Sequence, residues 1–352
     1  MKKSYYNFLF PGEDGKTILY NSRTGAMAEL DVEHTEQFKN WTEAELEEKA
    51  SEFANALYEN GFMIADNVSE LDMIRYDMHK AKFGGNVFKI VIAPTQNCNF
   101  GCKYCYEKEV IQSKYMNEDI QKVLIKYVEE NLVPSGELHV CWYGGEPLMA
   151  LDIIESLSKK FLELCKEKNI TYYADMITNG YLLEEEVAER LVRCEISQIQ
   201  ITIDGNEELH NRRRPLTNGE GTYKTIWNNL VMMQKFKNNI KIVLRVNVDK
   251  ENREAIYEIR SKIKEVGMSE YVFLYLGKVL DVKGCHNSEQ CYSSKEFSDL
   301  EQKFVCDELQ TLRYKYPTPK PIACGADSIR TMIVDYQGDM YKSKLVYWHI
   351  HL

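Results

Sequence analysis

Apolar and polar residues alternate in two different ways along this chain, and the change comes near residue 85. Before that point, three short strand-like runs at 5–10, 17–20 and 27–30 are separated by turn-forming Pro, Gly, Asp and Ser residues. Thr42 and Glu45 form a capping-box pattern, which predicts one helix running to about residue 58, before Asn60-Gly61. Residues 1–82 are therefore expected to form a small module of strands followed by helices.

From residue 87 onward, short apolar runs alternate with amphipathic stretches about six times. The apolar runs lie at 87–93, 138–143, 172–177, 197–203, 240–248 and 271–276. Buried strands that alternate with helices are typical of a parallel α/β sheet, and six such units predict an open partial barrel over residues 87–280. Functional residues of such sheets lie at the C-terminal ends of the strands. After residue 280 the periodicity weakens, so 281–352 is expected to be a linker and an unfinished tail.

Charge and composition exclude several classes of protein. No run approaches the roughly 20 apolar residues of a membrane-spanning helix, so no membrane contact is expected. The net charge is −10, which argues against a nucleic-acid partner. Fourteen Asp and Glu residues but three Lys and Arg residues fall between Glu29 and Asp77, where the acidity is concentrated. We expect a cytoplasmic protein whose ten cysteines stay reduced, so that clustered cysteines are metal ligands or catalytic groups.

Three of these cysteines, Cys98, Cys102 and Cys105, follow the first strand of the predicted barrel. With Gly101 letting the loop curl, the three thiols can converge on one soft metal centre. Zinc usually takes four protein ligands, commonly in paired C-x2-C motifs, and no second pair lies nearby. An iron–sulfur cluster with three cysteine ligands keeps one iron open. Structural thiols and a zinc loop are the alternatives.

The C-x3-C-x2-C spacing, with Tyr104 before the last cysteine, resembles the radical S-adenosylmethionine superfamily. The resemblance implies that the three cysteines hold a 4Fe-4S cluster, and that the amine and carboxylate of S-adenosylmethionine bind its open iron. It also implies reductive cleavage to a 5'-deoxyadenosyl radical, which takes hydrogen from the substrate. The implied fold is a partial (β/α)6 TIM-like barrel, and an electron donor such as flavodoxin or ferredoxin is expected.

A second motif closes the second strand and consists of Gly144, Gly145, Glu146 and Pro147. Two glycines permit close approach of the backbone, and a carboxylate beside them can accept a hydrogen bond from an ammonium group. In the family that the chain resembles, this motif contacts the amino group of S-adenosylmethionine. An ordinary turn is the alternative.

Polar residues also close the later strands, and the cofactor-binding candidates among them are Asn179, Thr202, Asp204 and Asn247. At the rim of the sheet they can bind a ribose, a carboxylate or adenine, although Asx turns and helix caps are equally good explanations. Relatives often have His-Asp where this chain has His210-Asn211, and Ser where it has Thr202. The arginines at 212–214 could meet a substrate carboxylate, but a solvated charge run is the favoured interpretation. No catalytic acid or base is identified.

The tail resembles the start of the auxiliary-cluster domain called SPASM, with Cys324 followed by Gly338. Ser343 stands where the second cysteine of that domain belongs, and a hydroxyl is a poor replacement for a thiolate on iron. Auxiliary clusters are therefore doubtful in this chain. The other cysteines form two groups: Cys285, Cys291 and Cys306 are undecided, whereas Cys141, Cys165 and Cys194 are interpreted as packing residues.

The front module resembles the winged-helix element that many maturases of ribosomal peptides carry. The resemblance rests on the order of strands and helices and on residues 20–25. Such elements capture a leader peptide on a strand edge, so a precursor peptide or protein is the expected substrate. The expected reaction is a thioether or carbon–carbon crosslink. The alternatives are formylglycine formation, as in anaerobic sulfatase maturation, and a binding protein without turnover.

Overall fold

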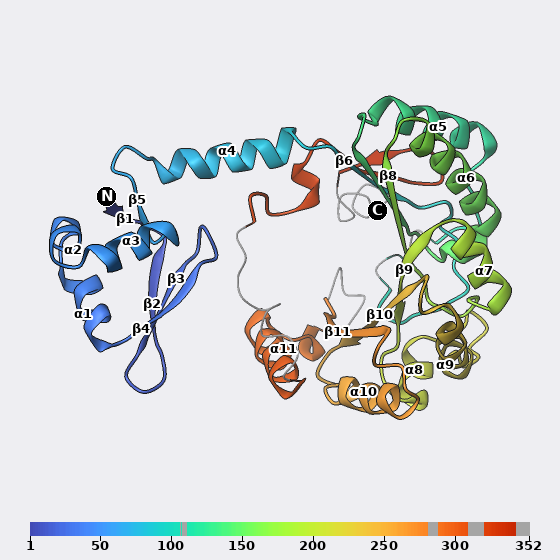
Figure 1. The fold of residues 1–352 in the computed structure, drawn as a ribbon. Coiled ribbons are helices and arrows are strands. Elements are labelled where there is room, and N and C mark those ends of the chain that lie inside the picture. The colour runs from blue at the N-terminus through green and yellow to red at the C-terminus, as the bar shows by residue number, and fades with distance from the viewer. Residues whose placement is uncertain (106, 108–110, 281–287, 309–319, 343–352) are drawn as a thin grey trace. The chain divides into compact units, whose positions relative to one another are not determined.

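The computed structural model describes residues 1–105, 107, 111–280, 288–308 and 320–342 (Figure 1). The chain divides into two compact units. The front unit comprises Met1–Gly84 and Gln302–Cys324, and the sheet unit comprises Gly85–Glu301 and Gly325–Leu352. The expected tail is thus divided between the two units.

The front unit contains a three-stranded antiparallel sheet, a short strand pair and four helices before residue 85. The sheet has the order β2-β3-β4, with β2 Asn7–Pro11, β3 Thr17–Asn21 and β4 Met27–Leu30, while β1 Lys2–Lys3 pairs with β5 Met63–Ile64. The helices are α1 Val32–Asn40, α2 Glu43–Lys49, α3 Ser51–Glu59 and α4 Glu70–Phe83. Residues of the sheet and of the first three helices share one hydrophobic core, which includes Leu19, Leu30, Phe38, Leu46 and Leu57.

The capping box predicted at Thr42 is confirmed, because its side chain and that of Glu45 satisfy each other's backbone N–H groups. The single helix predicted to follow it is wrong. Ala50 has φ −140° and ψ 53°, outside the helical region, so one helix ends at Lys49 and the next begins at Ser51. Neither proline nor glycine marks this position in the sequence, so no local signal identifies the break.

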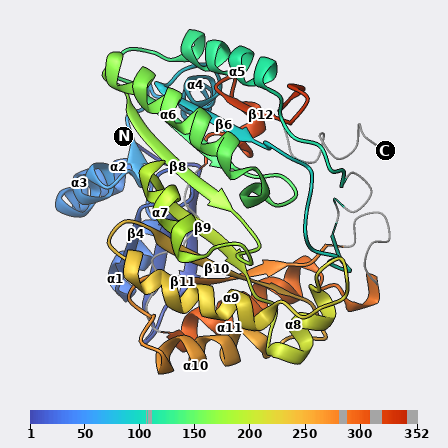
Figure 2. The same ribbon diagram turned by 90° about the vertical axis from the view of Figure 1, so that its right-hand side faces the viewer.

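The sheet unit is built on eight strands in the order β11-β10-β9-β8-β7-β6-β12-β13 (Figure 2). The strands are β6 Val87–Ile92, β7 Glu137–Trp142, β8 Thr171–Ile177, β9 Ile196–Thr202, β10 Lys241–Val248, β11 Val272–Lys278, β12 Thr331–Val334 and β13 Met340–Tyr341. All neighbouring pairs are parallel except β12 and β13. The six predicted strands are confirmed, and a hairpin from the expected tail extends the sheet beyond β6.

Helices alternate with these strands, as the periodicity predicts. They are α5 Glu118–Asn131, α6 Leu151–Glu167, α7 Glu185–Arg193, α8 Glu207–Arg213, α9 Tyr223–Met232 and α10 Ala255–Glu265, followed by α11 Ser294–Glu308. Short 3-10 helices lie at η1 Pro147–Ala150, η2 Met233–Phe236, η3 Ser288–Gln290 and η4 Gly325–Asp327. Among the described helices, none has both the length and the apolar character needed to cross a membrane.

The two faces of the sheet differ in burial. One face is covered by helices and carries fully buried side chains such as Val140, Ile201 and Val246. The alternate residues, which include Gln200 and Arg245, lie on the other face and are half-buried. We call this second face the open face. Within the described residues, β11 and β13 are the outer strands and do not pair, so the sheet is an open one.

Matched valine substitutions test this division into buried and exposed positions. Val140 in β7 is 0 % exposed, whereas Val123 in α5 is 66 % exposed. We expect Val140→Ala to lower the free energy of unfolding by about 2 kcal/mol, because two buried methyl groups and their packing are lost. Val123→Ala should change it by less than about 0.5 kcal/mol. Urea unfolding followed by circular dichroism measures both, and equal effects would contradict the assignment.

Candidate active site

The loop that carries the three cysteines leaves the C-terminal end of β6 and lies against the segment that follows α8. Gly101 N donates to Pro215 O at 2.8 Å, and Lys103 N donates to Arg213 O at 3.0 Å. Residues 93–105 are called the cysteine loop below. These backbone hydrogen bonds fix the loop to a segment more than a hundred residues away in the sequence.

The three thiols lie close enough to influence one another. Burial raises the pKa of Cys98 to about 12 and also raises the pKa of Cys102 and Cys105. Negative charge on Cys102 contributes to the raised pKa of both other thiols. A bound metal reverses this penalty, because it stabilises the thiolate form.

No three Cys, His, Asp or Glu side chains among the described residues converge on a point suited to a single metal ion. A 4Fe-4S cluster does not need such convergence, because each thiolate binds a different iron. Gly101 does not have the left-handed conformation that requires glycine, and a Cβ added there would lie 3.5 Å from Leu216 O, an ordinary contact. The expectation that a glycine is needed here to curl the loop is therefore wrong.

The Gly144-Gly145 turn, in contrast, touches the backbone of the cysteine loop directly. A Cβ on Gly144, whose φ is +119°, would lie 2.4 Å from Thr95 O. A Cβ on Gly145 would also lie 2.4 Å from a carbonyl oxygen of the loop, that of Asn97. Only glycine permits this approach, which joins the end of β7 to the loop.

The carboxylate of Glu146 is completely buried and connects the ends of two strands. Its Oε1 accepts hydrogen bonds from Leu148 N at 3.0 Å and Thr178 Oγ1 at 2.6 Å, and its Oε2 accepts one from Asn179 N at 2.7 Å. Burial raises the pKa of Glu146, although these three hydrogen bonds oppose the shift. The side chain therefore has a structural role between β7 and β8, and its contact with an ammonium group stays a prediction. Pro147 opens the 3-10 helix η1 directly after it.

Two of the predicted rim residues, Asp204 and Asn247, meet at Tyr104 of the cysteine loop. The Tyr104 hydroxyl donates to Asp204 Oδ2 and accepts from Asn247 Nδ2 at 3.1 Å and from Arg214 Nη1 at 2.8 Å. The other oxygen of Asp204 accepts from Asn247 N at 3.1 Å, and Arg213 Nε lies 3.6 Å from Oδ2. The aromatic residue of the cysteine motif is thus held by the ends of β9 and β10.

The interpretation of residues 212–214 as a solvated charge run is wrong for two of the three arginines. Arg213 and Arg214 are 4 % and 8 % exposed, because segment 213–217 packs against the cysteine loop. Arg213 forms an ion pair with Asp249 at 2.7 Å, and Arg214 lies over the ring of Phe100. Arg214 Nε is buried and has no hydrogen-bond partner within the described part of the chain. Arg212, in contrast, is exposed and pairs with Glu251.

His210 is connected by hydrogen bonds to Asp204 and, through Thr222, to Arg214. Its Nδ1 accepts from Asp204 N at 3.2 Å, and its Nε2 lies 3.1 Å from the Thr222 hydroxyl, which itself donates to Arg214 O. Burial lowers the pKa of His210 well below its usual value, and the nearby arginines lower it further. The side-chain oxygen of Asn211 accepts from Thr222 N at 2.8 Å.

The remaining predicted residues also lie at this rim. Asn179 Nδ2 donates to Asn99 Oδ1 of the cysteine loop at 2.8 Å, so its side chain bridges the loop and the end of β8. Thr202 is the last residue of β9 and pairs in register with Arg245 of β10. The structure therefore brings together the cysteine loop, the Gly-Gly turn and all four polar candidates.

The other cysteines lie away from the cysteine loop in sequence and differ in burial. Cys165 and Cys194 are buried, as expected for packing residues, whereas Cys141 is half-buried on the open face. Cys291 is half-buried and Cys324 is exposed. Cys285, the side chain of Cys306 and Ser343 lie outside the described residues, so the predictions for them stay predictions.

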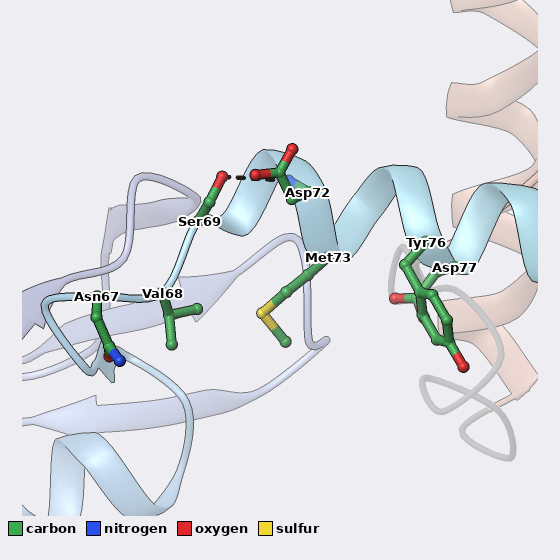
Figure 3. A pocket seen from close by; sticks show the side chains of 7 residues that line it. All are labelled: Asn67, Val68, Ser69, Asp72, Met73, Tyr76 and Asp77. Carbon is green, nitrogen blue, oxygen red and sulfur yellow. Dashed lines mark hydrogen bonds between the residues drawn. The ribbon is translucent and has the colours of Figure 1, made fainter.

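The front unit has a separate cavity of about 520 Å³ along α4 (Figure 3). It is lined by Asn67, Val68, Ser69, Asp72, Met73, Tyr76 and Asp77. The lining includes no cysteine and no residue of the rim described above. This cavity is therefore distinct from the candidate site at the C-terminal ends of β6 to β10.

The chain is similar in sequence to several known proteins. Residues 92–263 match the model of the Radical SAM superfamily. The radical SAM cyclopropyl synthase TigE of Paramaledivibacter caminithermalis is 22% identical over 240 residues, which are 62% of this chain and 49% of that protein. The serine-type anaerobic sulfatase-maturating enzyme of Klebsiella aerogenes is 26% identical, over 49% of this chain and 43% of that protein. The chain spans about half the length of these curated relatives.

The fold is also similar to that of solved structures. The structure of Streptococcus suis SuiB has a TM-score of 0.55 at 14% identity, covering 99% of this chain and 84% of that one. The structure of anSMEcpe with bound AdoMet and Cp18Cys peptide has a TM-score of 0.58 at 21% identity, covering 73% of this chain and 74% of that one. At these identities the likeness shows the fold alone.

Two alanine substitutions test whether the Gly-Gly turn positions the cysteine loop. In Gly145→Ala the new methyl group overlaps the loop backbone, which should cost at least about 1–3 kcal/mol and lower the iron content after anaerobic reconstitution. Gly101→Ala, within the loop itself, has room for its methyl group and should retain wild-type iron content. Iron and sulfide assays measure both proteins. Equal iron content in the two variants would contradict the role of the turn.

Proposed function

Because the chain carries a radical SAM superfamily domain at residues 92–263, we propose that it is a radical S-adenosylmethionine enzyme that modifies a peptide substrate. The observation that supports this most strongly is the convergence of three groups at one sheet edge. Three neighbouring thiols, a turn that only glycine can form and a buried arginine all meet where β6, β7, β9 and β10 end. Each of these features suits a cofactor that combines iron, an amine and a carboxylate.

Cys98, Cys102 and Cys105 would hold the 4Fe-4S cluster and leave one of its irons open. When bound, the cluster and S-adenosylmethionine supply one-electron cleavage to a 5'-deoxyadenosyl radical, which removes hydrogen from the substrate. The three half-buried thiols suit this role, because a bound metal would stabilise the thiolate form that burial and the nearby carboxylates disfavour.

Arg214 is the residue best placed to receive a carboxylate at this site. Its guanidinium is buried, is oriented by the Tyr104 hydroxyl and keeps Nε without a partner among the described residues. A buried donor without a partner is costly, so an anionic ligand would stabilise it. The relay from His210 through Thr222 to Arg214 O holds the backbone of this arginine in place.

The neighbouring residues orient the ligand and limit its mobility. The Gly144-Gly145 turn presents backbone without side chains, so a ligand can approach closely there. Asp204 and Asn247 hold Tyr104, and through it the cysteine loop, at a fixed position. Thr202 and Asn179 complete the polar rim that we propose for ribose or adenine contacts.

A precursor peptide is the substrate class that we propose, with a thioether or carbon–carbon crosslink as the product. A structure of SuiB bound to its precursor peptide SuiA supports this, since its likeness covers 97% of this chain, including the front unit. In the front unit, β2 and β4 are the outer strands of their sheet, so each can accept a peptide strand by β-augmentation. A flavodoxin or ferredoxin is the proposed electron donor, and the reducing cytoplasm is the proposed location.

Formylglycine formation on a protein substrate is the second candidate. It is supported by the similarity to serine-type and cysteine-type sulfatase-maturating enzymes. The likeness to anSMEcpe extends over 73% of this chain, however, whereas that to SuiB extends over 99%. This difference in coverage favours a precursor peptide as the substrate.

Release of 5'-deoxyadenosine tests the proposed chemistry and separates it from a binding protein without turnover. The full chain, anaerobically reconstituted, should release 5'-deoxyadenosine when it is incubated with S-adenosylmethionine and dithionite. Cys102→Ala removes a cluster ligand and should lower this release by more than about a hundredfold. Cys165→Ala, which changes a buried packing thiol on α6, should stay near the wild-type level. Absence of release from the reconstituted wild type would favour the binding interpretation.

A further inference from the structure

Arg245 lies on the open face of the sheet, one step down β10 from the rim. It pairs in register with Thr202 of β9 and with Tyr275 of β11, so the three side chains lie side by side. Asn247, which bonds to Tyr104, is the next residue of β10 on the same face. Arg245 is therefore adjacent to the proposed cofactor site but lies farther from the strand ends.

The guanidinium of Arg245 is held in a defined orientation by neutral groups. Its Nε donates to Asn247 Oδ1 at 2.6 Å, and its Nη1 donates to the Tyr275 hydroxyl at 3.3 Å. The Tyr275 hydroxyl in turn donates to Gln200 Oε1 at 2.8 Å, and the guanidinium lies 5.7 Å from the centroid of the Tyr275 ring. A long side chain fixed in this way has lost most of its rotamer freedom before any ligand arrives.

Gly277 provides the space in which this guanidinium lies. A Cβ added to Gly277 would be 2.3 Å from Arg245 Nε and 2.6 Å from its Nη2. Any side chain at 277 would therefore displace the arginine. The position of the Arg245 guanidinium on the open face therefore depends on glycine at 277.

The charge of Arg245 is not neutralised locally. Within the described residues, no carboxylate lies within the 4.0 Å of an ion pair with it, whereas Arg213 has three such partners. Asp204, at the end of the neighbouring strand, is already engaged by Tyr104, Arg213 and the backbone of Asn247. Two of the N–H groups of Arg245 are used, and the remaining donors are available on a half-buried face.

We propose that Arg245 binds a carboxylate of the peptide substrate and so sets which residue is presented to the cofactor. The carboxylate belongs either to an Asp or Glu side chain or to the C-terminus of the peptide. A fixed, partly desolvated guanidinium recognises a carboxylate by charge-assisted hydrogen bonds, and a neutral amide of the same shape cannot replace it. This inference rests on the proposed function, because it assumes that a peptide reaches the open face.

The test uses three pools of heptapeptides, random at the other six positions except that Asp and Glu are left out, incubated with the full-length, reconstituted protein. One pool has a fixed central Asp and an amidated C-terminus. A second has central Asn and an amidated C-terminus, and a third has central Asn and a free C-terminal carboxylate. Peptides retained by immobilised protein are quantified by mass spectrometry, so the readout does not depend on turnover.

We expect the wild type to retain at least one carboxylate-bearing pool about tenfold better than the Asn amide pool, as one charge-assisted hydrogen bond allows. Arg245→Gln should abolish this preference. Gly277→Ala, which keeps the arginine but displaces it, should weaken the preference as well. Lys241→Gln removes an exposed charge from the start of the same strand and should leave the preference intact. The pool that is retained tells a side-chain carboxylate from a terminal one.

Two results would overturn the inference: equal retention of all pools by the wild type, or an unchanged preference in Arg245→Gln. Circular dichroism of each variant confirms that it is folded. Release of 5'-deoxyadenosine is measured separately on the wild type. If 5'-deoxyadenosine is released but no carboxylate preference is found, this inference is wrong and the proposed function stands. If the carboxylate preference is found but no 5'-deoxyadenosine is released, the proposed function is wrong.

Discussion

The close contact between the Gly144-Gly145 turn and the cysteine loop determines where the loop lies relative to the end of β7. Both glycines lie where a Cβ would meet a carbonyl oxygen of the loop at 2.4 Å, so the two backbones can touch only without side chains. Glu146 then connects this turn to the end of β8 with a fully buried carboxylate that accepts three hydrogen bonds. The positions of three thiols thereby become fixed relative to the rigid strands of the sheet.

Two buried arginines lie next to the cysteine loop, and their positive charge explains why the site suits an anionic ligand. Burying a charge is costly unless it is paired, and Arg213 forms ion pairs with Asp204 and Asp249, although its Nε and Nη2 lack a hydrogen-bond partner among the described residues. Arg214 is only partly satisfied, since its Nε has no partner in the described part of the chain. His210 stays neutral because burial and these arginines disfavour its charged form, so it serves as a hydrogen-bond relay.

Much of the fold was predictable because strand and helix periodicity depends on local sequence. The strands carrying the site and the positions of Cys98, Glu146 and Asp204 at their ends follow from that periodicity. The burial of Arg214 was not predictable, because it results from packing against Phe100, more than a hundred residues away. The interruption at Ala50 has no local signal, and the room for a side chain at Gly101 depends on which backbone lies opposite that glycine.

We propose that the cysteine loop holds a 4Fe-4S cluster with one iron open to S-adenosylmethionine. Electron paramagnetic resonance of the reduced, reconstituted protein measures this most directly, because the spectrum of a reduced cluster depends on the ligands of its irons. We predict a cluster signal whose g values change when S-adenosylmethionine is added and stay unchanged when buffer is added in its place. A cluster signal that S-adenosylmethionine leaves unaltered at saturating concentration, or the absence of any cluster signal, would contradict the account.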